Sequence, residues 1–337
     1  MKINTPYYYF PPAADRQVIN PPVNPVAPLA DCRFITGATA SGKSELGLEL
    51  ARRLNAEIVS LDSMAVYRGL DIGTAKPSVD ARREVPHHLI DLVEPDAEFS
   101  LAQYLAAATR ASEAIISRGR EPLFVGGTPL YLKSLLRGIF QGPAADWELR
   151  HRLVAEAHER GADWLHQRVA EVDPAAARRL HPHDTRRLVR ALEVFEKTGR
   201  PISDWQRQFD RARPAEECRV FVLDWPREEL YRRIDARVEA MFAAGLIDEV
   251  RHLLAAGKRL GRTARQALGY REVLDHLAGN RSLPDTIELV KTRTRQFARR
   301  QLTWFRSLSE CRWISMGDGR TAGDLVAEIV GSGPGTP

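Results

Sequence analysis

The sequence predicts an α/β fold in which a parallel sheet is flanked by helices and interrupted by an all-helical insertion domain. Short apolar runs alternate with helical patterns before residue 143 and after residue 215, which is typical of strands joined by right-handed crossovers. Between these parts, residues 146–210 are rich in Arg and Ala and contain no plausible strand. A glycine-rich turn after the first apolar run indicates a phosphate-binding form of this fold.

The order of the elements follows from the spacing of apolar residues. Residues 32–36 form a short apolar run, and Leu46, Leu50 and Leu54 then recur at helical spacing. Three further apolar runs predict additional strands. The predicted strands cover residues 32–36, 56–61, 122–125 and 219–224. The predicted helices of the core cover residues 43–54, 100–118, 227–243, 246–256, 264–277 and 284–308.

Composition indicates the broad class of protein and its division into parts. The first 29 of the 337 residues contain seven prolines and no periodicity, which predicts a disordered tail. No stretch approaches the ~20 apolar residues of a membrane span, and no signal-peptide pattern is present, so we expect a cytoplasmic protein that contacts no membrane. Three widely spaced cysteines indicate buried reduced thiols. The predicted parts are a disordered tail at 1–29, a core at 30–142 and 216–318, a helical insertion at 143–215 and a C-terminal tail at 319–337.

The glycine-rich turn carries a P-loop motif. Residues 37–44 read Gly-Ala-Thr-Ala-Ser-Gly-Lys-Ser and match G-x-x-x-x-G-K-[ST] at every defined position, between a predicted strand and a predicted helix. Backbone N–H groups of such a loop and the N-terminus of its helix bind phosphate oxygens. Lys43 would neutralise the terminal phosphate, and Ser44 could coordinate Mg²⁺. The fold class is therefore P-loop NTPase-like, with the phosphate-binding residues Gly37, Thr39, Ala40, Ser41, Gly42, Lys43 and Ser44.

Two polar residues lie just beyond the carboxyl ends of predicted strands, at the edge of a parallel sheet where ligands bind. Asp62 could coordinate Mg²⁺, act as a general base for an incoming nucleophile, or cap the next helix. Thr128 follows two glycines and could donate a hydrogen bond to a phosphate oxygen or only complete a turn. The strand before Thr128 ends in glycines where a Walker-B element would supply an acid, and this weighs slightly against an ATPase.

Basic residues are concentrated in two windows of a chain whose net charge is +5. Residues 178–200 hold seven Arg or Lys against three acidic residues, and residues 258–306 hold twelve against four. Such polarity is typical of a face that binds nucleic acid, although Arg-rich helices can also simply carry a solvated outer face. Charge alone therefore leaves both interpretations open.

Together with the P-loop, several other segments resemble the tRNA dimethylallyltransferase family, also called the tRNA isopentenyltransferases. The segments are collinear over roughly residues 32–315, and their combination is far more specific than any one of them. Ala38 departs from the family's usual proline and Ala65 from the residue that many members carry, which leaves one substrate contact open. Besides 37–44, the matching segments are Asp-Ser-Met-Ala-Val-Tyr-Arg-Gly (62–69), Asp-Ile-Gly-Thr-Ala-Lys-Pro (71–77), Val-Pro-His-His-Leu-Ile-Asp (85–91), Gly-Gly-Thr-Pro-Leu-Tyr (126–131), Arg-Arg-Leu-Val-Arg-Ala-Leu-Glu (186–193), Gly-Tyr-Arg-Glu (269–272) and Arg-Gln-Leu-Thr-Trp-Phe-Arg (300–306).

The resemblance implies transfer of a dimethylallyl group from its diphosphate to the exocyclic N6 amine of the adenosine 3′-adjacent to the anticodon. Mg²⁺ is the implied cofactor, the partners are dimethylallyl diphosphate and the tRNA anticodon loop, and a monomer would suffice. Asp62 would be the catalytic base, Thr128 would bind the oxygen that bridges carbon and phosphorus, and Arg237 would be a further diphosphate ligand. The implied tRNA-binding residues are Asp62, Ser63, Met64, Ala65, Thr128, Arg150, Arg186, Arg187, Leu188, Val189, Arg190, Arg265, Gly269, Tyr270 and Arg271.

Three other functions remain as alternatives. A P-loop small-molecule kinase explains residues 37–44 but not the basic windows. An adenylate isopentenyltransferase shares the donor, but the helical insertion and the segment 300–306 argue against a free nucleotide as acceptor. A non-enzymatic RNA-binding module would leave Lys43, Asp62 and Thr128 together without a role.

Overall fold

The structure, a computed structural model, describes residues 29–139, 142–161, 163–206, 212–257, 260–317 and 319–332. The predicted N-terminal tail lies outside these residues except for Leu29. Two compact units divide the described chain: the helical unit falls within 138–211, and the sheet unit within 27–137 and 212–337. Among the described helices, none combines the length and the apolar composition that crossing a bilayer requires.

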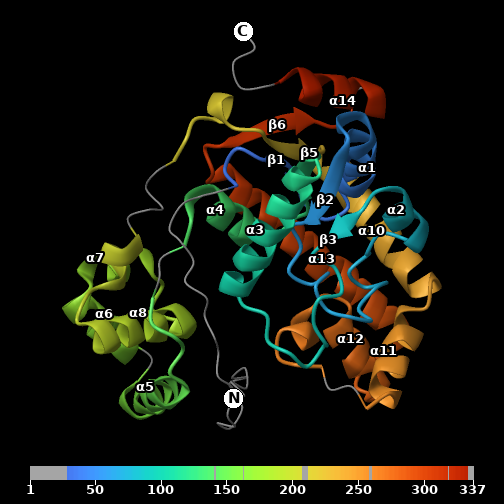
Figure 1. Ribbon diagram of the computed structural model, residues 1–337. Helices are drawn as coiled ribbons and strands as arrows, with labels where there is room; N and C mark the ends of the chain where they lie inside the picture. Colours follow the sequence, from blue (N-terminus) through green and yellow to red (C-terminus); the bar gives the residue numbers. More distant parts are fainter. Residues whose placement is uncertain are drawn as a thin grey trace. The chain divides into compact units, whose positions relative to one another are not determined.

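A six-stranded sheet in the order β3-β2-β4-β1-β5-β6 organises the sheet unit (Figure 1). Every strand pairing is parallel, so all the strands end at the same edge. This arrangement confirms the predicted α/β class with a P-loop-like parallel sheet. The strands are β1 (Arg33–Gly37), β2 (Ala56–Ser60), β3 (His87–His88), β4 (Glu121–Val125), β5 (Val220–Asp224) and β6 (Cys311–Ser315).

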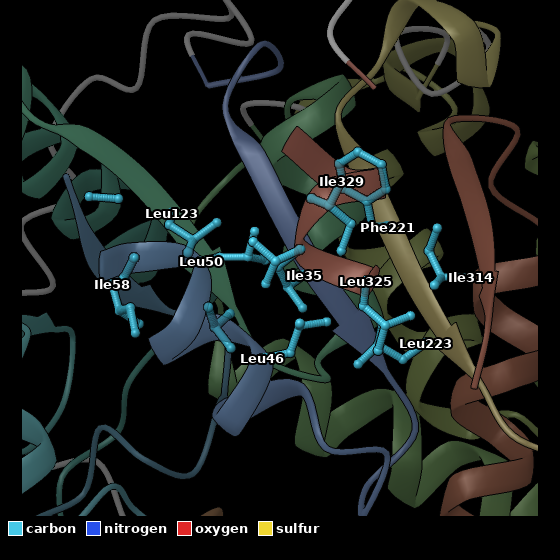
Figure 2. Packing of buried hydrophobic residues seen from close by; sticks show 14 of the residues in the cluster. Ile35, Leu46, Leu50, Ile58, Leu123, Phe221, Leu223, Ile314, Leu325 and Ile329 are labelled. Carbon is cyan, nitrogen blue, oxygen red and sulfur yellow. The ribbon is translucent and has the colours of Figure 1, made fainter. Parts of the chain in front are cut away.

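An apolar core fills one face of the sheet (Figure 2). Ile35 of β1 and Leu123 of β4 are fully buried there against Leu46 and Leu50. Leu46 and Leu50 are one helical turn apart and therefore lie on the same face of their helix. The spacing that predicted this helix thus also places its packing face.

The predicted helices of the sheet unit are observed with one break, whereas the helices at 79–84, 129–137 and 322–331 were not predicted. The predicted helix 264–277 is two elements, because Gly269 has a φ of 91° and lies outside the helical region. The α-helices of this unit are α1 (Lys43–Leu54), α2 (Val79–Glu84), α3 (Leu101–Ser117), α4 (Pro129–Arg137), α10 (Arg227–Ala243), α11 (Leu246–Ala255), α12 (Tyr270–Leu277), α13 (Leu283–Arg306) and α14 (Ala322–Gly331). Two 3₁₀ turns, η2 (Ala215–Glu217) and η3 (Ala264–Gln266), complete it.

The segment predicted as a C-terminal tail from residue 319 instead contains helix α14, which belongs to the core. Thr321 caps the helix by accepting a hydrogen bond from the Asp324 N–H. The side chain of Ile329 is fully buried in the core of Figure 2. The guanidinium of Arg33 on β1 donates to the Ile329 carbonyl at 2.8 Å. An apolar stripe and a cap therefore fix this segment as part of the core.

The helical unit contains α5 to α9 around its own apolar cluster. Leu188 and Val169 are completely buried in this cluster. Its helices are α5 (Trp147–Arg160), α6 (Trp164–Val172), α7 (Pro174–Arg179), α8 (Thr185–Thr198) and α9 (Ile202–Trp205). The unit spans Gly138–Arg211, a few residues earlier than the predicted insertion at 143–215.

The three cysteines are free thiols at the start of neighbouring strands. Cys32 precedes β1, Cys218 precedes β5, and Cys311 begins β6. Burial raises the pKa of Cys32 to about 11 and that of Cys311 to about 12, so both thiols stay protonated at neutral pH. The expectation of unpaired thiols is confirmed, although Cys32 is only partly buried.

Candidate active site

The turn between β1 and α1 has the backbone geometry of an anion-binding loop. Ala40 has a φ of 64° and Gly42 a φ of 88°, so two residues with positive φ flank Ser41, a backbone pattern typical of anion-binding turns. Gly42 is also the N-cap of α1 and provides no side-chain cap. The first N–H groups of α1 are therefore available to an anion.

Side chains that follow β5 hold the carbonyl groups of this loop. The indole Nε1 of Trp225 donates to the Ser41 carbonyl at 2.9 Å, and Nε of Arg233 donates to the Ala40 carbonyl at 2.9 Å. The Arg233 guanidinium also stacks over the Trp225 ring, 4.5 Å from its centre. Because the C=O and N–H of a peptide point in opposite directions, these bonds keep the N–H groups aimed at the other side of the loop.

The side chain of Lys43 lies close to the guanidinium of Arg237 and the carboxylate of Asp62. Its Nζ donates to the Ala38 carbonyl at 3.1 Å. Burial and, to a smaller extent, the positive charge of Arg237 lower the pKa of Lys43 to about 8 against the opposing effect of Asp62. Burial also lowers the pKa of Arg237, again against Asp62. Two partly desolvated cations beside one carboxylate favour the binding of a multivalent anion.

Asp62 stands at the end of β2 and is held by a local hydrogen bond. Its Oδ1 accepts from the Met64 N–H at 2.8 Å, which fixes the direction of the carboxylate. Within the described residues Oδ2 has no hydrogen-bond donor. The carboxylate can therefore accept a proton at one oxygen while the other stays anchored.

Thr128 is held between the loops that follow β2 and β4. Its backbone N–H donates to the Leu61 carbonyl at 3.1 Å, and its Oγ1 accepts from the Ser63 N–H at 3.1 Å. A hydroxyl that already accepts one hydrogen bond still has its own hydrogen to donate. Thr128 thus combines a fixed position with a free donor.

One cavity of about 370 Å³ brings ten of the predicted site residues together. All the residues that line it belong to the sheet unit. Its apolar wall includes Ile58, Met241, Phe242 and Phe297. The predicted residues that line it are Thr39, Lys43, Ser44, Asp62, Ser63, Met64, Ala65, Thr128, Arg237 and Gly269. A phosphate-binding end and an apolar wall suit a ligand that joins a diphosphate to a hydrocarbon.

The predicted basic residues of the helical unit have two different environments. Arg150 and Arg190 both pair with the fully buried Glu193. Burial acts to raise the pKa of Glu193, but these partners hold it below its usual value. Arg186 and Arg187 are exposed, and Arg187 forms a surface pair with Asp184, the N-cap of its helix. Of the remaining predicted residues of this helix, Leu188 and Val189 are buried in the apolar cluster.

The predicted residues between 265 and 271 also differ in their exposure to solvent. Arg265 and Arg271 are exposed, whereas Tyr270 is completely buried. The Tyr270 hydroxyl donates to Glu249, which also accepts from the Asp71 and Ile72 N–H groups at 3.0 and 2.7 Å. The tyrosine side chain therefore fixes a loop of the cavity.

Several cavity residues were not predicted from the sequence. Lys76, His87, Arg300 and Gln301 line the cavity. All four lie in segments that supported the family resemblance, and Arg300 and Gln301 both belong to the segment 300–306. Sequence position identified these segments, but it could not show which side chains point inward.

The donor set for a metal ion is limited. Among the described residues, no group of three or more His, Cys, Asp or Glu could hold a metal ion. Ser44 is exposed at the start of α1 and lines the cavity, so its hydroxyl fits an ion that takes its other ligands from diphosphate oxygens and water.

The parallel sheet, the P-loop and the half-apolar cavity define a phosphate-binding α/β protein built for an organic diphosphate. Comparison with known proteins narrows this class: the chain belongs to the IPP transferase family. The model of that family matches residues 65–308, and a model described as isopentenyl transferase matches residues 30–87.

Relatives and solved structures agree with this assignment. A tRNA dimethylallyltransferase of Geobacter metallireducens is 50% identical over 83% of this chain and 91% of its own length. A tRNA dimethylallyltransferase of Rhodopirellula baltica is 47% identical over 89% of this chain and 93% of its own length. The crystal structure of a tRNA isopentenylpyrophosphate transferase from Bacillus halodurans is 38% identical, has a TM-score of 0.64 and covers 90% of this chain and 96% of that one. The crystal structure of a eukaryotic dimethylallyltransferase acting on tRNA is 28% identical and has a TM-score of 0.69. The match covers 86% of this chain and 74% of that one.

Proposed function

We propose that this chain transfers a dimethylallyl group from dimethylallyl diphosphate to the N6 amine of the adenosine 3′-adjacent to the anticodon of tRNA. The observation that carries the proposal is the cavity in which the P-loop, Asp62 and Thr128 meet an apolar wall. A kinase needs a site for a nucleoside triphosphate and an acceptor, and neither requires this wall beside the phosphates. Membership of the IPP transferase family supports the same reaction.

The residues have complementary roles in this reaction. The first N–H groups of α1, Lys43 and Arg237 bind the diphosphate, whose negative charge grows as the bond from the allyl carbon to oxygen breaks. Thr128 donates to the bridging oxygen, which leaves with the bonding electrons. The amine nitrogen forms the new bond to carbon, and Asp62 accepts the proton that it loses. Diphosphate and N6-dimethylallyladenosine are the products.

A magnesium ion would complete the diphosphate site. Ser44 would contribute its hydroxyl, and the bound ion would supply additional positive charge to the leaving group. Since the described part of the chain offers no cluster of acidic, His or Cys ligands, the diphosphate itself would provide much of the coordination of the ion.

The acceptor base reaches the cavity only after it leaves the stack of the anticodon loop, at a cost of a few kcal/mol. Exposed arginines such as Arg186, Arg265 and Arg271 are suited to contact the RNA backbone and recover that cost. We place the enzyme in the cytoplasm as a monomer acting on one tRNA.

Labelled dimethylallyl diphosphate tests the proposal directly. Incubation with unmodified tRNA or with AMP, followed by nucleoside analysis, should yield labelled N6-dimethylallyladenosine from tRNA alone. Asp62→Ala should abolish transfer while tRNA affinity is retained. Labelled AMP would indicate a free-nucleotide prenyltransferase, and wild-type turnover by Asp62→Ala would refute the role of the base.

A further inference from the structure

Gln301 joins the P-loop to the loop that carries Thr128. Its side chain is only 4% exposed although it lines the cavity. Oε1 accepts from the Thr39 N–H at 2.9 Å, and Nε2 donates to the Gly127 carbonyl at 2.5 Å. A single amide on α13 therefore bridges two segments that are 88 residues apart in the chain.

The chemistry of the two partners requires an amide at this position. The Thr39 N–H needs an acceptor and the Gly127 carbonyl needs a donor, so only a side chain with both can serve them. A carboxylate could bind the first partner but would repel the second. An apolar side chain would leave two backbone groups unpaired in a nearly dry environment.

Close packing around Gly127 supports the same bridge. A Cβ at this residue would lie 2.7 Å from Nε2 of Gln301, 3.1 Å from the Gly37 carbonyl and 3.4 Å from Cε of Lys43. The loop after β4 can therefore approach the P-loop this closely only with glycine at this position. The preceding carbonyl, that of Gly126, accepts from the Thr36 hydroxyl at 2.8 Å. Two successive carbonyls are thus fixed, one by β1 and one by α13.

We infer that Gln301 is a positioning residue that sets the distance between the diphosphate-binding loop and Thr128. The inference rests on the proposed diphosphate site. The P-loop binds the terminal phosphate, whereas Thr128 addresses the bridging oxygen, so both must fit one diphosphate at the same time. Both polar atoms of the Gln301 amide are engaged by backbone groups of the two loops. Gln301 acts by holding the two loops at the separation that one diphosphate spans.

Steady-state kinetics with both substrates test the inference. Gln301→Met removes both hydrogen bonds at similar size, and Gln301→Glu keeps the bond to Thr39 while losing the one to Gly127. Both variants should raise the KM for dimethylallyl diphosphate by roughly tenfold or more, and the inhibition constant of diphosphate in parallel. The KM for tRNA should stay within about twofold of wild type. Thr286→Val is the matched control, because Thr286 is also buried on α13 but bonds only to the carbonyl of Ser282 at 2.7 Å.

The outcomes separate positioning from general stability. A selective change in the donor constants, absent from Thr286→Val, supports the inference. Wild-type donor constants in both Gln301 variants, or an equal rise in the KM of both substrates, would overturn it. Lys43→Met and Thr128→Val test the site on which the inference rests. If Lys43→Met and Thr128→Val lose activity while the Gln301 variants keep wild-type constants, only the role of Gln301 is refuted. If Lys43→Met and Thr128→Val keep wild-type turnover, the proposed diphosphate site itself is wrong.

Discussion

The pKa of Lys43 makes donor binding depend on pH in a defined direction. Burial and the charge of Arg237 lower this pKa to about 8, whereas an ordinary lysine titrates near 10.5. A diphosphate prefers the protonated ammonium, so binding raises the pKa and affinity is highest below pH 8. With a pKa of about 8, roughly nine-tenths of the free enzyme carries the proton at pH 7 and roughly one-tenth at pH 9. The Kd for dimethylallyl diphosphate should therefore rise about tenfold between these values and about tenfold more by pH 10.

Calorimetry without tRNA measures this effect without interference from titrating bases. Titrations in two buffers of different ionisation enthalpy should show uptake of close to one proton at pH 9 and almost none at pH 6.5. Lys43→Met should bind weakly at every pH and show no proton uptake, which provides the control. A Kd that stays constant from pH 7 to pH 9.5, or proton release on binding, would refute the assignment of Lys43 as the titrating diphosphate ligand.

Three further predictions concern other parts of the molecule. Arg186→Ala should weaken tRNA binding and lower the salt dependence of log Kd by about one, as filter binding from low to high salt would show; unchanged affinity would argue against a basic RNA-binding face. Arg190→Ala should mainly reduce thermal stability, by about 1–3 kcal/mol, because it removes a partner of the buried Glu193; an unchanged melting temperature would contradict this. Gly73→Ala should destabilise the chain by about 1–3 kcal/mol and slow transfer, because the added Cβ would lie 2.4 Å from the Tyr270 ring. Thermal denaturation and turnover assays should show partial recovery when Tyr270→Leu is added, and no recovery would contradict this cause.

Local patterns in the sequence predicted the central part of the fold. The P-loop could be predicted because its glycines, its lysine and the strand before it are all encoded within a dozen consecutive residues. By contrast, β6 is short and mixes Arg312 with apolar residues, and α14 gains its stability from contacts with distant strands. The mixed pattern of β6 gives a weak local signal. Helix α14 has a cap and an apolar stripe in its own sequence, but only its packing against distant strands shows that it belongs to the core.

In the candidate site, too, the sequence indicated the segments that matter but not the partners of their side chains. Arg186 and Arg190 are four residues apart on one helix and have the same chemistry, yet only Arg190 reaches the buried Glu193. Family resemblance placed Tyr270 in the RNA contact, but packing buries its ring and directs its hydroxyl to Glu249. A motif identifies which segment matters, whereas the partners of each side chain follow from contacts far along the chain.

The order of the strands also has a consequence for motion. The loops that hold the P-loop, Asp62 and Thr128 stand on β1, β2 and β4, and each of these strands is hydrogen-bonded to a neighbour on both sides. Backbone amides in buried strands that are paired on both sides become accessible to solvent only in large unfolding events. The amides of β1, β2 and β4 should therefore show some of the slowest hydrogen exchange in the chain. The donor therefore meets a rigid surface. Any adjustment to the incoming base has to come from the loop 73–77 and from the helices that form the other walls.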